Sequence, residues 1–175
     1  MNDLTITQNN LPDNLEDLSK FVLVGREKLV SVRAYIKAIN KLELAEDVRE
    51  QKKEEAQMLG EALLDAETRI GELLQQIPKA QGKRNDVTLS HQCEEVRKQE
   101  TKQEVITRLG FNKDQASRFE TLASNKDIVE LVKAEARENE DIPTRSRVLQ
   151  LVKEKSKEEK YIEQEFKKIE DEKAI

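Results

Sequence analysis

The chain has 175 residues, of which 38% are charged, 36% hydrophobic and only 3% aromatic, and its formal net charge is −5. Five glycines and three prolines are too few turn-forming residues for an all-β fold, and a core so poor in aromatic residues must be built from aliphatic residues on amphipathic helices. We therefore expect an all-α protein with long N-terminal helices, a compact helix-turn-helix-like middle region and a long, charged C-terminal helix.

The N-terminus and the cysteine content bear on location. Residues 1–12 are polar, with no apolar signal-peptide core, and are expected to be disordered. The longest nearly apolar stretch, Phe21–Val24, is far too short to span a bilayer. Cys93 is the one cysteine, so the chain forms no internal disulfide, which favours a reducing compartment. We expect a cytoplasmic protein that does not enter a membrane.

Residues 13–77 are predicted to form a long-helix region. Apolar residues recur at helical spacing from Leu15 to Leu44, and Gly25 can divide this stretch into two helices. A second helix is expected from Ala45 to Ile77, where Pro78 ends it.

An apolar seam runs along the second of these helices, and its members alternate between steps of three and four positions, as in a coiled coil. The seam consists of Ala56, Leu59, Leu63, Ala66, Ile70, Leu73 and Ile77. Gly60 and Gly71 lie close to one helix face, where small residues let a partner helix approach closely. Two alternatives remain open: the seam packs within one chain, or it joins two chains as a coiled-coil homodimer.

The middle of the chain, unlike its two ends, carries an excess of basic over acidic residues. Residues 78–88 are expected to form an exposed linker, and residues 89–142 a helix-turn-helix-like domain. The first helix of this domain is expected to start at Thr88 or Ser90 and to run to Leu109.

The next helices are marked by their caps. Gly110 is expected to end the first helix, and Asn112 to cap a short helix, Lys113–Ala123. Another helix is expected over Lys126–Glu138. Residues 143–175 are predicted to form a charged C-terminal helix that opens at Thr144.

The stretch KQEVITRLGFNKDQASRFETLA has the form of a helix-turn-helix, with Gly110 at the turn and Phe111 between the two helices. Outward residues of its second helix suit DNA, because Arg binds guanine, Gln binds adenine, and Ser or Thr reach bases and phosphates. The predicted contacts from this helix are Asn112, Lys113, Gln115, Ser117, Arg118 and Thr121. Further phosphate contacts are expected from Lys83, Arg84, Lys102 and Arg108. Against this, any two helices joined by a short glycine turn give a similar pattern, and Asp114 and Glu120 would oppose phosphates that they face.

The segment ITRLGFNKDQASRFETLA, followed by IPTRSRVLQLVKE, resembles the helix-turn-helix of ParB-type partition proteins and of small phage or plasmid proteins. The preceding AQMLGEALLDAETRIGELLQQIPKAQG resembles prophage-encoded proteins that pair an IGELL-like motif with a downstream LG-x-(S/N)-K-x-Q-x-S-R segment. The second motif stands here as Leu109, Gly110, Asn112, Lys113, Gln115, Ser117 and Arg118. The resemblance covers residues 45–153 and implies DNA binding by the second helix. The arginine-rich nucleotide-binding motif of ParB proteins is not found, so no nucleotide chemistry is implied.

No catalytic motif is evident in the sequence. It has no phosphate loop, nucleophile elbow or HExxH motif. His91 and Cys93 are too few ligands for a structural zinc site, which needs four. We expect neither enzymatic activity nor a metal or other cofactor.

Three functions follow as hypotheses. The first is a DNA-binding protein of a phage or mobile element, acting on double-stranded DNA as a homodimer. The second is a phage-encoded inhibitor that binds a host protein, such as a defence or nucleic-acid enzyme, through its acidic helical surface. The third is a coiled-coil adaptor joined by the Ala56–Ile77 seam.

Overall fold

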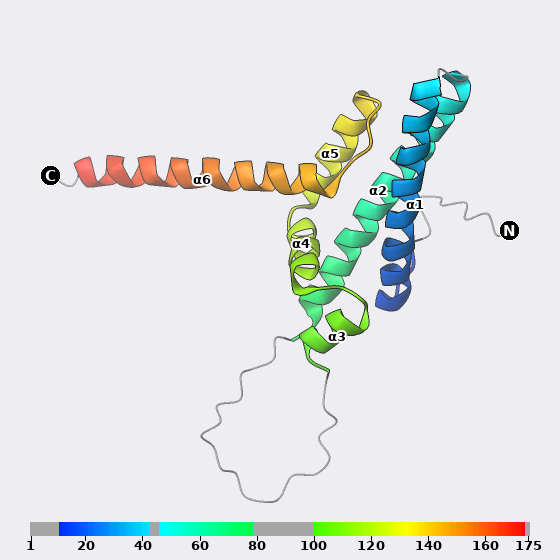
Figure 1. Ribbon diagram of the computed structural model, residues 1–175. Coiled ribbons are helices and arrows are strands. Elements are labelled where there is room, and N and C mark those ends of the chain that lie inside the picture. The colour runs from blue at the N-terminus through cyan, green and yellow to red at the C-terminus, as the bar shows by residue number, and fades with distance from the viewer. Residues whose placement is uncertain (1–10, 43–45, 79–99, 174–175) are drawn as a thin grey trace, which may run out of the picture.

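A computed structural model of the protein describes residues 11–42, 46–78 and 100–173. The secondary structure of these residues is helical, which confirms the all-α prediction (Figure 1). The helices are α1 (Leu15–Leu42), α2 (Glu46–Gln76), α3 (Lys102–Arg108), α4 (Lys113–Ala123), α5 (Lys126–Glu138) and α6 (Arg145–Lys173). None of them combines the length and the apolar character that a membrane span requires.

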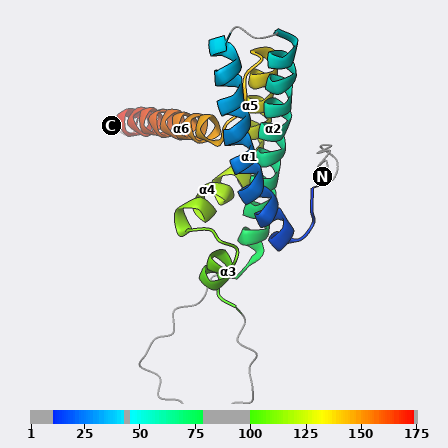
Figure 2. The same ribbon diagram turned by 45° about the vertical axis from the view of Figure 1, so that its right-hand side comes forward.

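Helices α1 and α2 lie side by side as a long hairpin in both views (Figures 1 and 2). α1 continues through Gly25 without a break, so the division that this glycine allows does not occur. The glycine instead marks the close approach of α1 to α2, because a Cβ at this position would lie 2.8 Å from Cδ2 of Leu63. α2 ends at Gln76, just before Pro78, as predicted.

The apolar seam of α2 packs inside this chain. Ala56, Leu59, Leu63, Ala66 and Ile70 are buried, and Leu73 and Ile77 are partly buried against the same core. Residues from α1, α3 and α4 complete that core. Helices of its own chain therefore cover the seam, which is the first of the two alternatives. The homodimer stays a prediction, and it would need another surface.

Helix α4 lies across α2 at Gly71. A Cβ at this position would overlap the backbone carbonyl of Phe119, so only glycine allows the two helices to come this close. Phe119 itself is 0% exposed. The helix-turn-helix-like region thus shares one core with the long-helix region.

A second cluster joins α4, α5 and α6 to the other side of α2. Its buried members are Leu64, Leu122, Ile128, Val129, Val132 and Val148. The hydroxyl of Thr144 accepts a hydrogen bond from the backbone N–H of Arg147 at 3.3 Å, so α6 opens where the sequence predicts. Beyond this cluster α6 projects away from the body of the molecule (Figure 1).

Two glutamates of α2 are buried, and each meets an arginine from another helix. Arg137 donates two hydrogen bonds to Glu61, at 2.7 and 2.6 Å. Arg26 donates two to Glu67, at 3.0 and 2.6 Å. Buried carboxylates need such partners because they have lost their water.

Candidate nucleic-acid interface

The first helix of the helix-turn-helix-like segment, α3, is short, and two reciprocal hydrogen bonds between Thr101 and Glu104 cap its N-terminus. The hydroxyl of Thr101 accepts the N–H of Glu104, and the Glu104 carboxylate accepts the N–H of Thr101 at 2.7 Å. Glu100 and Thr101 are not helical, so the prediction of one helix running from Thr88 or Ser90 is wrong at these residues. The T-x-x-E spacing of Thr101 and Glu104 was the sequence signal for the true start.

The turn between α3 and α4 has the geometry that the sequence predicts. Gly110 has φ +80°, a conformation that side chains with a Cβ rarely adopt. The N–H of Phe111 donates to the carbonyl of Ile106 at 3.1 Å and closes the turn. The buried Phe111 ring meets Phe119 edge to face, with centroids 5.1 Å apart. This pair fixes the angle between the two helices.

Helix α4 has a buried face and an exposed face. Ala116, Phe119 and Leu122 are buried on one face. Lys113 and Arg118 are exposed, and neither forms an ion pair with a described residue. Ser117, together with Asp114, is also exposed. Two cations therefore stand on the outer face of α4 with one carboxylate between them.

Other side chains of α4 that were predicted to contact DNA already form hydrogen bonds within the helix and its N-terminal cap. The side chain of Asn112 accepts the N–H of Gln115 at 2.8 Å, and the side-chain oxygen of Gln115 accepts the N–H of Asn112 at 2.9 Å. Thr121 is half-buried and donates to the carbonyl of Ser117 at 2.9 Å. The adenine contact expected of Gln115 would have to break this cap, which stabilises the helix by about 1 kcal/mol.

The predicted phosphate contacts on the α3 side are electrically compensated. Lys102 pairs with Glu120. Arg108 pairs with Glu16 and, at 3.1 Å, with Glu100. The negative charge of Glu100 is the larger cause that raises the pKa of Arg108, and the hydrogen bond to Glu16 is the next. Lys83 and Arg84, like His91 and Cys93, lie outside the described residues.

Sequence reasoning missed three arginines on the opposite flank of α4. Arg26, Arg33 and Arg145 line an open cavity of about 280 Å³ between α1, α2 and the start of α6. The guanidinium carbons of Arg26 and Arg145 lie 5.4 and 5.9 Å from the ring centroid of Phe119. Arg26 and Arg33 are seven positions apart and so share a helix face, which the sequence could have shown. Arg145 joins them only through the tertiary fold.

Among the described residues, Glu67 is the one carboxylate that lines this arginine cavity. Arg26 holds it at 2.6 Å, whereas Arg145 reaches it only at 3.4 Å. Burial lowers the pKa of Arg145, and repulsion from Arg26 and Arg118 lowers it further. Attraction to Glu67 raises the same pKa but does not cancel the lowering. Arg33 is half-buried and pairs with no described residue. The cavity therefore holds more positive charge than its carboxylate compensates.

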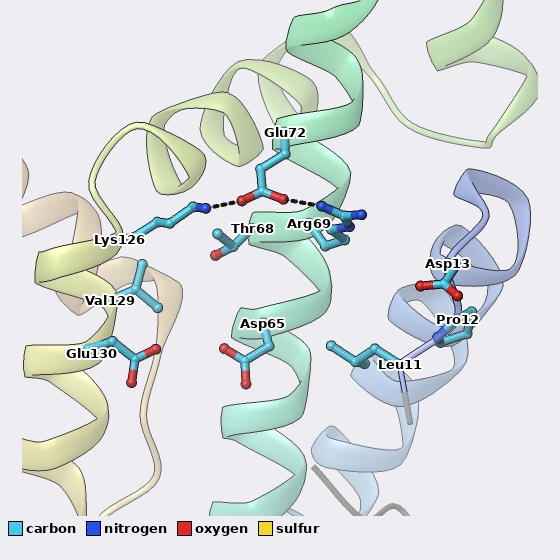
Figure 3. A pocket seen from close by; sticks show the side chains of 10 residues that line it. All are labelled: Leu11, Pro12, Asp13, Asp65, Thr68, Arg69, Glu72, Lys126, Val129 and Glu130. Atoms are coloured by element: carbon cyan, nitrogen blue, oxygen red, sulfur yellow. Dashed lines mark hydrogen bonds and ion pairs between the residues drawn. The ribbon is translucent and has the colours of Figure 1, made fainter. Parts of the chain in front are cut away.

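A second cavity, of about 370 Å³, has the opposite character (Figure 3). Asp13, Asp65, Glu72 and Glu130 line it with Arg69 and Lys126. Glu72 pairs with Lys126 and, at 2.7 Å, with Arg69. Lys133 pairs with Asp65 and, at 2.7 Å, with Glu130. The four carboxylates therefore meet three cations, which leaves this cavity a small negative excess.

The described residues hold no cluster of three or more side chains suited to bind a metal ion. Compared with known protein families, with curated proteins and with solved structures, the chain matches none. Its function is therefore inferred from the chemistry of the α4 face and the arginine cavity.

Proposed function

We propose that this protein binds double-stranded DNA through the exposed face of α4. The observation that carries the proposal is the pair Lys113 and Arg118, which are exposed and free of ion pairs among the described residues. They stand on a helix held at a fixed angle to α3 by the Gly110 turn. A helix in this position presents its N-terminal residues to base edges in the major groove.

The distribution of charge over the surface also supports binding of DNA at the exposed face of α4. The chain as a whole carries −5, which repels DNA at most approaches. On the α1 and α6 flank of α4, however, Arg26, Arg33 and Arg145 line a cavity with a single carboxylate, Glu67, among its described residues. This flank attracts the phosphate backbone, and the acidic remainder directs DNA to it.

The test is fluorescence anisotropy of labelled duplex DNA against salt concentration. Lys113→Ala with Arg118→Ala is expected to raise Kd at least tenfold, because a good base contact contributes about 1–3 kcal/mol. Loss of two phosphate or base contacts also lowers the slope of log K against log salt by about 2.

The matched control removes two lysines from the projecting part of α6. Lys153→Ala with Lys157→Ala changes net charge equally, and both side chains are exposed. This variant is expected to bind DNA nearly as the parent does. Equal losses in the two variants, or no salt-dependent binding by the parent at low ionic strength, contradict the proposal.

The alternative of an inhibitor of a host enzyme gives a different result. Such a protein would retain one host protein in a lysate pull-down after nuclease treatment, whereas a DNA-binding protein would lose its co-purifying material. Substitution of Lys113 and Arg118 would then leave the co-purifying protein unchanged.

A second candidate function, a helical adaptor, is favoured by α6. Tyr161 and Ile162 are 66% and 53% exposed on the part of this helix that projects from the body (Figure 1). A lone helix is only marginally stable in water, so a partner helix on this face would stabilise it. In a homodimer of this kind, Ile162→Glu would convert dimer to monomer in sedimentation. A monomeric parent protein would exclude it.

A further inference from the structure

We infer that the arginine cavity between α1, α2 and the start of α6 binds a phosphate group, and that the backbone of a nucleic acid supplies it. The assignment of the phosphate to a nucleic-acid backbone rests on the proposed DNA binding, whereas the phosphate site itself does not depend on it. The site differs from the face of α4, since none of its lining residues comes from that helix.

The first argument is unbalanced charge in a confined space. Arg26, Arg33 and Arg145 line the cavity, and Glu67, the one carboxylate among its described lining residues, can compensate a single positive charge. Arg145 lies 3.4 Å from that carboxylate, a weak contact, and Arg33 has no such partner among the described residues. Half-buried cations whose charge is not fully compensated are costly. A phosphate would compensate the positive charge that Glu67 leaves.

The second argument is chemical fit. A guanidinium presents parallel N–H donors whose spacing matches two phosphate oxygens, and arginine keeps its charge throughout the physiological range. The cavity is open to solvent and has a volume of about 280 Å³. That is small for a drug-like ligand, whose pockets span roughly 300–1,000 Å³, but it accommodates a phosphate with its neighbouring sugar.

The first turn of α6 lies at the cavity beside the arginines. Thr144, Arg145 and Ser146 line the cavity. The backbone N–H of Arg147 donates to Thr144 and begins the hydrogen bonding of the helix. The N–H groups of Arg145 and Ser146 come before it in the chain, at positions where a helix supplies no backbone acceptor. Amides in this position favour an anion, and the helix dipole adds to their effect.

The position of the cavity ties it to α4. Arg26 and Arg145 lie over the ring of Phe119, which follows Arg118 directly in α4. Arg118 is also near enough to repel Arg145. A backbone phosphate held here therefore lies on the flank of the face that Arg118 presents to bases.

The phosphate arm of the test uses the full chain and inorganic phosphate. The Nε–H resonances of the arginines are followed by NMR during a titration, against chloride at equal ionic strength. Phosphate is expected to shift Arg26, Arg33 and Arg145 in a saturable manner that chloride does not reproduce.

The variant for this arm is Arg33→Gln, which removes a charge that forms no ion pair with a described residue and is expected to leave the fold intact. It is expected to weaken phosphate binding at least fivefold. The matched control, Lys37→Gln, removes one exposed charge from the next turn of α1, outside the cavity. Equal effects of phosphate and chloride on the parent, or equal losses in both variants, overturn the inference.

The DNA arm separates this inference from the proposed function. Arg33→Gln is expected to lower the salt slope by about 1 and to weaken binding alike for all duplex sequences. If DNA binds and phosphate does not, the inference fails and the proposed function stands. If phosphate binds and DNA does not, the proposed function fails, and with it the assignment of the phosphate to a nucleic-acid backbone. Phosphate binding that survives Lys113→Ala with Arg118→Ala supports a separate site.

Discussion

The two cavities beside α2 differ in the sign of their charge although they share one helix. Glu67 lines the arginine cavity, and Asp65, two positions earlier, lines the acidic one. Two positions on a helix correspond to a rotation of about 200°, so these side chains leave α2 on opposite sides. A chain whose formal charge is −5 thus carries a positive face next to α4 and a negative face behind it. Net charge predicts neither face.

The largest effect is expected from removing the ring that supports the arginine cavity. Phe119→Ala empties a site that is 0% exposed and is expected to cost about 4 kcal/mol of unfolding free energy. Urea unfolding measures it. Leu131→Ala, at a position that is 57% exposed, is the control and should change stability by less than about 0.5 kcal/mol. A loss below 1 kcal/mol for Phe119→Ala would contradict the packing described.

The next effect concerns the crossing of α2 and α4. Gly71→Ala places a Cβ against the backbone carbonyl of Phe119, which can move only if α4 moves, so about 2–3 kcal/mol should be lost. Gly25→Ala is the matched control. Its Cβ meets the end of the flexible Leu63 side chain, and a helical Gly→Ala change gains about 1 kcal/mol, so near-neutral stability is expected. Thermal unfolding of both variants gives the comparison.

Glu67→Gln sharpens the contrast between the cavities, because it removes the one carboxylate that lines the arginine cavity. Stability should fall by about 1–2 kcal/mol as charged hydrogen bonds to Arg26 and Arg145 weaken. Phosphate affinity should nevertheless rise severalfold, since less positive charge is compensated. Calorimetric titration with phosphate distinguishes this from a purely structural role, in which affinity would fall together with stability.

The smallest effect is expected on the acidic side. Hydrogen bonds from Lys126 and Arg69 lower the pKa of Glu72 below its usual value of 4.5. A carboxyl whose pKa is lower in the folded state stabilises the fold above the unfolded pKa and loses this effect as pH falls through the folded pKa. Glu72→Gln should therefore cost less than about 1 kcal/mol at pH 7 and nothing at strongly acidic pH. Urea unfolding of the parent and the variant at pH 7 and at strongly acidic pH measures whether the stability difference disappears as the pH falls.

Much of the secondary structure was predictable because its signals are local. Pro78 ends α2, Asn112 caps α4, Gly110 turns the chain and Thr144 opens α6, all as the sequence indicates. The start of α3 was predicted wrongly, although Thr101 and Glu104 form a box that the same rules recognise. Each signal lies within a few residues of the element that it controls.

The candidate site was predicted only in part, because ion pairing depends on distance in space. Lys102 and Arg108 looked as available as Arg118, but Glu120 and Glu16 compensate them, the latter from 92 positions away. Arg26, unremarkable in sequence, reaches Glu67 across 41 positions. No periodicity encodes such encounters.

The sequence by itself determined that this chain is helical and where most of its helices begin and end, since caps, prolines and apolar spacing act over one or two turns. Tertiary structure alone decided that the seam of α2 is covered within the chain and which arginines keep uncompensated charge. Helix formation is a local property of the backbone, whereas the charge of a surface depends on which distant side chains the fold brings within reach of one another.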